Sequence, residues 1–277
     1  MTHSALRQWF YAQLSALYLQ GELQSMYHWC VKEIHGWSRA EVYTRNDDSV
    51  AETDLSKWKL IVERLSKNEP IQYIFQKASF FDFELFVDEN VLIPRPETEE
   101  LVQMLLDENA SKELRVLDIG TGSGCIPLAL KKARPIWQIS GCDISDEALQ
   151  VARKNSLKLE LEVDFFQADV VQLENLDSLD IIISNPPYIP VNRKESLEAN
   201  VLEHEPHIAL FSPKDDAFYF FRVIAEVAMK SKVKKVCFET HATEMEELVS
   251  ALTQIWKGSV RKAKDLGGKE RFIILES

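Results

Sequence analysis

The sequence predicts a two-part α/β protein, in which a helical amino-terminal region precedes a mostly parallel sheet covered by helices on both faces. Over residues 3–70, apolar side chains recur with the period of a helix, and no Gly or Pro interrupts the runs. Beyond residue 114, short continuous apolar runs alternate with helical segments. Such runs are typical of parallel strands that are buried on both faces.

Residues 1–70 are predicted to form an α-helical bundle of four segments. Gly36 follows the second segment and is a suitable stop for a helix. Ser38 and Glu41 have the spacing of a capping box that would open a short third helix. Asp54 could cap the fourth. We expect the many aromatic residues of this region to form its core.

Residues 71–94 are rich in Ile, Phe and Val and are expected to form a β-hairpin connector, with a Phe-Asp turn inside ASFFDFELFV. Residues 95–277 would then be a single α/β domain. Its expected strands are RVLDI, WQISGCD, LEVDFFQAD, LDIIISN, VKKVCFET, SVRKAKDL and RFIILES. The last two strands lie too close in sequence for a helix of normal length, so they should pair antiparallel at one edge.

Composition argues against several classes of protein. The formal net charge is −12, all of it carried beyond residue 80, so no strongly basic face for duplex nucleic acid is expected. No apolar run is long enough for a membrane span, and the amino terminus lacks the pattern of a secretion signal. Four scattered cysteines indicate reduced, cytoplasmic thiols without metal-like pairing.

A glycine-rich loop follows the first strand of the α/β region, in the order Gly120-Thr121-Gly122-Ser123-Gly124. Glycines there allow a tight turn and a close approach of the backbone to a ligand at the following helix. Asp143 ends the second strand, where a carboxylate can accept hydrogen bonds from both ribose hydroxyls. No Walker lysine follows the loop, and its spacing differs from the dinucleotide fingerprint. A nucleoside cofactor without pyrophosphate, S-adenosylmethionine, fits best; the alternative is a tight turn in another doubly wound protein.

Two further features lie at the ends of later strands. Asp169 ends the third strand and could receive an adenine amino group; alternatively it is a helix cap or a loop acid. The fourth strand ends in Asn185-Pro186-Pro187-Tyr188, beside the first strand at the switch point of the sheet. The Asn side chain and the proline carbonyls can accept both hydrogens of a planar NH₂ group, and Tyr188 could stack on its plane. This arrangement suits methylation of an amide or an exocyclic amine.

Several motifs in this order resemble one family. IPRPETEELV (93–102), VLDIGTGSGCIPLAL (116–130), SNPPYIP (184–190), the Glu-Pro of EHEPHIAL and DLGGKERF (265–272) are similar to segments of protein-glutamine methyltransferases of the HemK/PrmC type. The likeness runs from about residue 69 to the carboxyl terminus. It departs from the family at Val170, in FSPKDDAF (211–218) and in KSKVKKVCFETH (230–241).

The resemblance implies a Rossmann-like S-adenosylmethionine-dependent methyltransferase fold, with a seven-stranded, mostly parallel sheet whose last strand is antiparallel. It implies that glycine loop 120–124, Asp143, the Asp169-Val170 segment and Asn185 bind the cofactor, which leaves as S-adenosylhomocysteine. It places Asn185, Pro186, Pro187 and Tyr188 at the amide of a glutamine in the Gly-Gly-Gln loop of class I peptide chain release factors, so that the reaction modulates translation termination. We expect a monomer in which residues 1–70 recognise the substrate protein, and no metal. Arg95 and Glu97 should lie close to the site, in roles that the motif leaves open.

Three other functions remain as alternatives. A DNA or RNA adenine methyltransferase shares the Asn-Pro-Pro-Tyr motif, but it must flip its base and bind phosphates, which the acidic balance disfavours. A non-catalytic binding module predicts decay of the glycine loop or of the Asn-Pro-Pro-Tyr motif, and both are intact. A zinc site at His204 and His207 lacks the metalloprotease spacing.

Overall fold

The structure is a computed structural model that describes residues 1–109, 113–174, 176, 178–241 and 244–277. The chain divides into two compact units, which we call unit 1 (Met1–Gln76 with Glu198–His204) and unit 2 (Lys77–Leu197 with Glu205–Ser277). The return of residues 198–204 to unit 1 was not expected from the sequence. No helix in the described part of the chain is long and apolar enough to cross a membrane.

Unit 1 is helical, and the local sequence accounts for some of its helix ends. Gly36 ends the second helix at φ +71°, and Ser38 and Glu41 form the predicted capping box. Tertiary contact places residues 198–204 here, where the His204 ring Nε2 lies 2.8 Å from the Lys67 carbonyl oxygen. The helices are α1 (His3–Leu14), α2 (Gln20–His35), α3 (Arg39–Thr44), α4 (Glu52–Leu65), α5 (Ile71–Phe75) and α9 (Ala199–His204).

The core of unit 1 is aromatic. Trp58 of α4 is fully buried, and its ring packs 5.6 Å from that of Phe10 and 5.1 Å from that of Tyr27, measured between ring centres. Leucines and valines of α1, α2 and α4 surround these rings. Each fully buried large side chain contributes about 1.5–3 kcal/mol relative to exposure, so this cluster is a main source of stability for unit 1.

Two local predictions for this region are wrong. Asp54 does not cap α4, because the helix begins two residues earlier at Glu52, with Ala51 at the cap. Residues 71–75 were expected inside the β-hairpin connector, but they form α5. The short apolar run IQYIF has no clear period in sequence. In the structure Ile71, Ile74 and Phe75, which have helical spacing, pack against the core of unit 1.

Unit 2 contains a mostly parallel sheet of seven strands among the described residues, in the order β10-β11-β9-β6-β3-β4-β5. Strands β4, β3, β6 and β9 run parallel to one another, whereas β11, the last strand, pairs antiparallel with both β9 and β10. The predicted mostly parallel sheet and the predicted antiparallel pairing of the last two strands are therefore both confirmed. The strands are β3 (Arg115–Ile119), β4 (Gln138–Asp143), β5 (Asp164–Gln167), β6 (Ile181–Ser184), β9 (Lys235–Glu239), β10 (Ser259–Lys264) and β11 (Glu270–Glu276).

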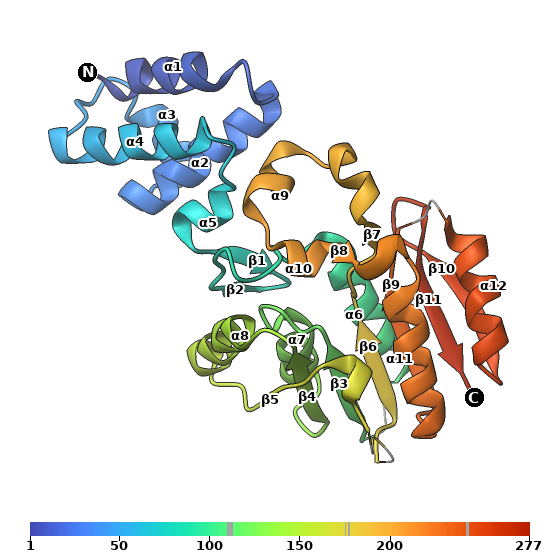
Figure 1. Cartoon of the computed structure of the whole chain (residues 1–277). Helices are drawn as coiled ribbons and strands as arrows, with labels where there is room; N and C mark the ends of the chain where they lie inside the picture. The colour runs from blue at the N-terminus through green and yellow to red at the C-terminus, as the bar shows by residue number, and fades with distance from the viewer. Residues whose placement is uncertain (110–112, 175, 177, 242–243) are drawn as a thin grey trace. The chain divides into compact units, whose positions relative to one another are not determined.

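Helices cover both faces of this sheet, as the continuous apolar strands predict (Figure 1). On one face pack α6 (Pro96–Glu108), α7 (Cys125–Ala133) and α8 (Asp146–Leu159), together with the hairpin β1 (Ala78–Phe80) and β2 (Phe83–Leu85). On the other face pack α11 (Tyr219–Lys230) and α12 (Met245–Ile255). The sequence predicts a helix over residues 243–256, whose first residue lies outside the described residues.

Short elements complete unit 2 between β6 and α11. The two-residue strands β7 (Ile189–Pro190) and β8 (Phe211–Ser212) pair in parallel. The remaining elements are the 3₁₀ turns η1 (Val170–Gln172), η2 (Val191–Ser196) and η3 (Pro213–Asp215), and the helix α10 (His207–Leu210). The excursion into unit 1 occurs between η2 and α10, so the chain leaves and re-enters unit 2 within the segment that follows Asn185-Pro186-Pro187-Tyr188.

Candidate active site

The carboxyl ends of the parallel strands border a cavity within unit 2. Ligands of open α/β sheets bind at this edge, because the strand order reverses there and leaves a crevice. The cavity is lined by residues of the glycine loop, of the ends of β4, β5 and β6, and of the segment before α6. Among the predicted site residues it brings together Gly120, Thr121, Gly122, Ser123, Asp143, Asp169, Val170, Asn185, Pro186 and Pro187.

The three glycines of the loop differ in the space that surrounds their Cα atoms. All three have positive φ, at +75° for Gly120, +51° for Gly122 and +78° for Gly124. A Cβ added at Gly120 or Gly122 would meet nothing within 4 Å, so space is open in front of both. A Cβ at Gly124 would lie 3.0 Å from the Phe165 ring and 3.1 Å from the Ala152 side chain. Gly124 therefore permits close packing, and it does not line the cavity.

The carboxylate of Asp143 holds the loop and the following helix in register. Its Oδ2 accepts a hydrogen bond from the Gly122 backbone N–H at 2.9 Å, and its Oδ1 accepts one from the Ser145 N–H at 3.0 Å. Burial raises the pKa of Asp143, and these backbone donors oppose that shift. Each carboxylate oxygen still has a second lone pair to offer to a ligand.

Asp169 and Val170 form the next part of the cavity wall. Asp169 caps η1, because its Oδ1 accepts from the Val171 N–H at 2.9 Å and its Oδ2 from the Gln172 side chain at 3.2 Å. Val170 is 8% exposed and packs into the core beneath the cavity. Asp169 therefore acts as the helix cap that the sequence allowed as an alternative. It also lines the cavity, so the two roles are compatible.

Asn185, Pro186 and Pro187 follow directly after β6 and line the same cavity as the glycine loop. No hydrogen bond occupies the Asn185 side-chain amide within the described ranges of the chain. Its carbonyl oxygen is therefore available to a ligand. The preceding residue, Ser184, is fully buried, and its hydroxyl donates to the Ile119 carbonyl at 2.6 Å. This bond ties the end of β6 to the end of β3, where the glycine loop begins.

Tyr188 lies outside the residues that line the cavity. Its side chain packs against the hydrophobic cluster on the α11 face of the sheet. Burial raises the pKa of its phenol to about 12, and the nearby Glu239 carboxylate adds to this shift. The structure therefore separates Tyr188 from the three residues before it.

Two buried carboxyl groups lie near the cavity: Glu205, which the sequence marked only as part of the Glu-Pro motif, and Glu239, which it did not single out. Glu205 is 3% exposed, accepts from the Ile93 N–H at 3.3 Å and pairs with the Arg95 guanidinium at 2.5 Å. Glu239 is also 3% exposed and accepts a 2.7 Å hydrogen bond from the Thr98 hydroxyl. Arg95 and Thr98 both line the cavity. The motif IPRPETE pointed to this segment, but the partners of its side chains lie more than 100 residues away in sequence.

Asn155 was also missed, although it supports the glycine loop from behind. Its side-chain amide is fully buried in α8; the Nδ2 donates to the carbonyl oxygens of Ser123 and Phe86, each at 2.9 Å, and the Oδ1 accepts from the Phe86 N–H at 2.7 Å. One side chain thus joins the loop to the segment that follows the β1–β2 hairpin. An Asn within a helical run carries no sequence signal for such a role.

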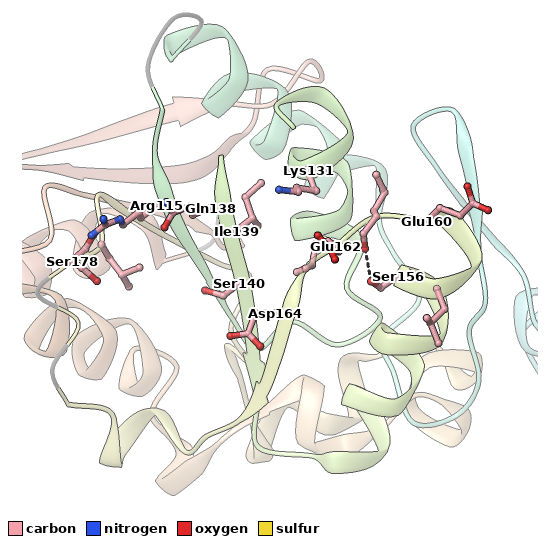
Figure 2. A pocket seen from close by; sticks show the side chains of 14 residues that line it. Arg115, Lys131, Gln138, Ile139, Ser140, Ser156, Glu160, Glu162, Asp164 and Ser178 are labelled. Carbon is pink, nitrogen blue, oxygen red and sulfur yellow. Dashed lines mark hydrogen bonds between the residues drawn. The ribbon is translucent and has the colours of Figure 1, made fainter. Parts of the chain in front are cut away.

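A second, wider cavity lies on unit 2 and is lined by residues of the amino ends of β3, β4 and β5 and of the carboxyl end of α8 (Figure 2). Arg115, Lys131, Glu160, Glu162 and Asp164 provide its charged side chains. The Lys131 ammonium is engaged with the carbonyl oxygens of Pro135 and Trp137. The cavity contains neither the glycine loop nor the Asn-Pro-Pro segment, and it lies at the opposite ends of the strands. The described ranges also hold no cluster of His, Cys, Asp or Glu suited to a metal ion.

Replacing Asn155 by Leu should loosen the glycine loop. The substitution keeps the branched shape of the side chain but removes three hydrogen bonds and leaves their backbone partners unpaired, at about 1–3 kcal/mol for each unsatisfied group. We expect a lower midpoint of thermal unfolding and a faster exchange of the Gly122 and Gly124 amide hydrogens. Asn90→Leu, at a side chain that bonds only locally to Asp88, is the control. Unchanged exchange at the loop would show that Asn155 does not support it.

Comparison with known proteins assigns this chain to a family. A model of the methyltransferase small domain matches residues 96–204, and a model of the PrmC N-terminal domain matches residues 5–75. The fold of the hMettl16 catalytic domain, solved in complex with MAT2A 3′UTR hairpin 6, is similar with a TM-score of 0.58 at 14% identity, covering 81% of this chain and 82% of that one.

Curated relatives resemble the chain over nearly its whole length. The release factor glutamine methyltransferase of Flavobacterium psychrophilum is 36% identical over 95% of both chains. That of Bacteroides thetaiotaomicron is 38% identical over 94% of this chain and 95% of its own. Identity of this extent covers both the helical unit and the cavity with its glycine loop. The chain therefore belongs to the release factor glutamine methyltransferase family.

Proposed function

We propose that this protein transfers a methyl group from S-adenosylmethionine to the side-chain amide nitrogen of the glutamine in the Gly-Gly-Gln loop of class I peptide chain release factors. The observation that supports this function best is that Asn185, Pro186 and Pro187 line the same cavity as the glycine loop and Asp143. The relatives with this chemistry in their names match over nearly the whole chain. The consequence of the reaction is a change in the efficiency of translation termination.

The donor side of the cavity fits S-adenosylmethionine. Open space in front of Gly120 and Gly122 lets the backbone approach the amino-acid part of the cofactor. The remaining lone pairs of Asp143 are available to the ribose hydroxyls, and those of Asp169 to the adenine amino group. When bound, S-adenosylmethionine supplies an electrophilic methyl group on a positively charged sulfur.

The acceptor side fits a planar amide. The Asn185 side-chain carbonyl and the Pro186 carbonyl accept hydrogen bonds from the two N–H groups of the glutamine amide. These two bonds turn the amide nitrogen toward the methyl group. An amide nitrogen is a poor nucleophile because its electron pair is delocalised. The site therefore has to accelerate the transfer by aligning the nitrogen with the methyl group and by polarising its N–H bonds. The nitrogen electron pair forms the new N–C bond, the electron pair of the broken C–S bond remains on sulfur, and one amide proton passes to water. We assign Tyr188 to the wall behind Asn185, since it does not line the cavity.

Asn185→Ala should strongly slow methylation and keep most of the binding of the cofactor. The purified protein with S-adenosylmethionine should add one methyl group to the Gly-Gly-Gln peptide of a cognate release factor, as mass spectrometry detects. Loss of one oriented polar group from the transition state should lower the rate by about 10²–10³-fold. Asn192→Ala, on the exposed η2 segment, is the matched control. A wild-type protein that leaves a folded cognate factor unmodified would contradict the substrate, whereas an active Asn185→Ala variant would contradict the role of Asn185.

Asp143→Asn should weaken binding of S-adenosylmethionine by about tenfold to hundredfold, because a charge-assisted hydrogen bond contributes about 1.5–3 kcal/mol. The Asn side chain keeps the size of the residue but can accept from only one of the two backbone N–H groups that Asp143 holds. Exchange of the Gly122 amide hydrogen therefore measures any loosening of the loop separately from the loss of the ribose contact. Isothermal titration calorimetry measures the change. Asp146→Asn, in the exposed first turn of α8, should retain wild-type affinity. Equal affinities of the two variants for S-adenosylmethionine would contradict the proposal that Asp143 binds the ribose.

We further propose that unit 1 holds the release factor while unit 2 performs the transfer. Unit 1 presents exposed apolar side chains at Leu17 and Leu19, which are 48% and 77% exposed. The double variant Leu17→Ser/Leu19→Ser should raise the KM for the intact factor by about fivefold and leave that for a short Gly-Gly-Gln peptide unchanged. Leu157→Ser on unit 2, at an 80% exposed leucine, is the control. An equal rise of the KM for the intact factor and for the short peptide would contradict a role of unit 1 in holding the release factor.

Three further properties belong to this proposal. The substrate is a translation factor and the four cysteines are free and buried, which supports a cytoplasmic location. The net charge of −12 supports a protein that does not bind duplex nucleic acid directly. We also propose that the protein acts as a monomer, because the glycine loop, Asp143 and Asn185 already meet within unit 2 and the proposed transfer requires no further residue.

A further inference from the structure

A buried carboxyl group lies directly behind the acceptor side of the cavity. Glu239 is the last residue of β9, and Asn185 follows the last residue of β6. These strands are adjacent and parallel, with Ser184 opposite Phe238, so Asn185 and Glu239 continue from neighbouring strands at the same level. Adjacent strands lie about 4.8 Å apart. Glu239 therefore stands beside the residue that we assign to the glutamine amide.

Thr98 connects Glu239 to the cavity. Its hydroxyl donates to the Glu239 Oε2 at 2.7 Å, and Thr98 itself lines the cavity together with Asn185 and Pro186. Both side chains of the pair are 3% exposed. Because the hydroxyl proton is committed to Glu239, the Thr98 oxygen can only accept hydrogen bonds from the cavity side.

Glu239 has no ion-pair partner among the residues that the structure describes. The two guanidinium groups whose charges reach it contact other carboxylates. Arg271 is shared between Glu97 at 3.6 Å and Asp265 at 3.3 Å. Arg95 is paired with Glu205. The titratable and charged groups around Glu239 are Glu97 and Arg95 at the start of α6, Arg271 of β11, Tyr188 after β6 and Cys125 of α7.

Burial raises the pKa of Glu239 to about 7, and the charge of Glu97 adds to this shift. The Thr98 hydrogen bond and the charges of Arg271 and Arg95 act in the opposite direction. A buried carboxylate without a cation is costly, so a positive ligand charge nearby should be favoured. S-adenosylmethionine carries such a charge on sulfur, whereas the product S-adenosylhomocysteine is neutral at that atom.

We propose that Glu239 is a positioning residue that acts through Thr98: its carboxylate orients the Thr98 hydroxyl in the cavity wall beside Asn185, and its negative charge favours the cationic donor over the neutral product. This inference rests on the proposed function for its ligands. It goes further by assigning to one buried carboxylate a part in exchanging product for donor after each turnover. The charge that holds the donor is lost from sulfur when the methyl group leaves.

Binding measurements test the charge. Calorimetry gives the Kd of S-adenosylhomocysteine divided by that of S-adenosylmethionine, and this ratio isolates the sulfonium because the rest of the two molecules is the same. Glu239→Gln should lower the ratio about fivefold to tenfold. In the wild type the ratio should rise with pH between about 6 and 8, since the carboxyl group is protonated below its pKa and charged above it. In Glu239→Gln the ratio should not change over this range. Glu247→Gln, at an exposed carboxylate of α12, should behave like the wild type.

Thr98 variants test the positioning role by kinetics. Thr98→Val removes the hydroxyl at nearly constant volume and should lower kcat about tenfold with little change in the KM for the release factor. Thr98→Ser restores the donor and should recover most of kcat. A structural role alone would not be rescued by a hydroxyl in this manner.

The outcomes separate this inference from the function on which it rests. The affinity ratio requires no protein substrate, so it decides the role of the Glu239 charge even if the release factor is not methylated. A wild-type ratio that is flat from pH 6 to 8, or a Glu239→Gln ratio equal to that of the wild type, would overturn the inference. If Glu239→Gln does not fold, as circular dichroism would show, the Thr98 pair still decides it. The wild-type pH trend alone does not, because burial also raises the pKa of Asp118, at the end of β3, to about 7. An inactive Thr98→Ser would contradict the positioning role.

Discussion

The parallel register of β4, β3, β6 and β9 is the constraint on which the site depends. Each pairing aligns the ends of two strands, so the glycine loop, Asp143, Asn185 and Glu239 emerge at one edge of the sheet. Backbone hydrogen bonds enforce this alignment, because a slip by one residue would turn each buried side chain to the opposite face. Two side-chain bonds then refine it: Ser184 fastens the end of β6 to the end of β3, and Asn155 fastens the loop to the chain behind it.

Buried charge is distributed unevenly around this edge. The Arg95–Glu205 pair joins the segment before α6 to residues that follow the excursion into unit 1. Arg271 joins the β10–β11 turn to α6 through Asp265 and Glu97. Among these acids Glu239 is held by a hydroxyl instead of a cation, and we propose that its charge acts on the ligand for this reason.

The division into two units has a physical basis in the two cores. Unit 1 is built on stacked and edge-on aromatic rings of α1, α2 and α4, and unit 2 on aliphatic side chains that cover both faces of the sheet. Residues 198–204 belong to unit 1 even though Asn185 and Glu205, on either side in sequence, belong to unit 2. The segment that follows the acceptor motif is therefore anchored in the unit that we propose to bind the protein substrate.

Local sequence determined those features whose causes are local. Helical period, the Ser38–Glu41 capping box, the glycine turn and the apolar strands all predicted elements that the structure contains, and the order of strands and helices predicted the sheet. The motifs also marked most residues that line the cavity. Only the tertiary structure decided that IQYIF is helical, that Tyr188 stands behind the cavity, and that residues 198–204 join unit 1. It alone revealed the roles of Asn155, Glu205 and Glu239, because the partners of these buried polar groups are distant in sequence and are selected by packing.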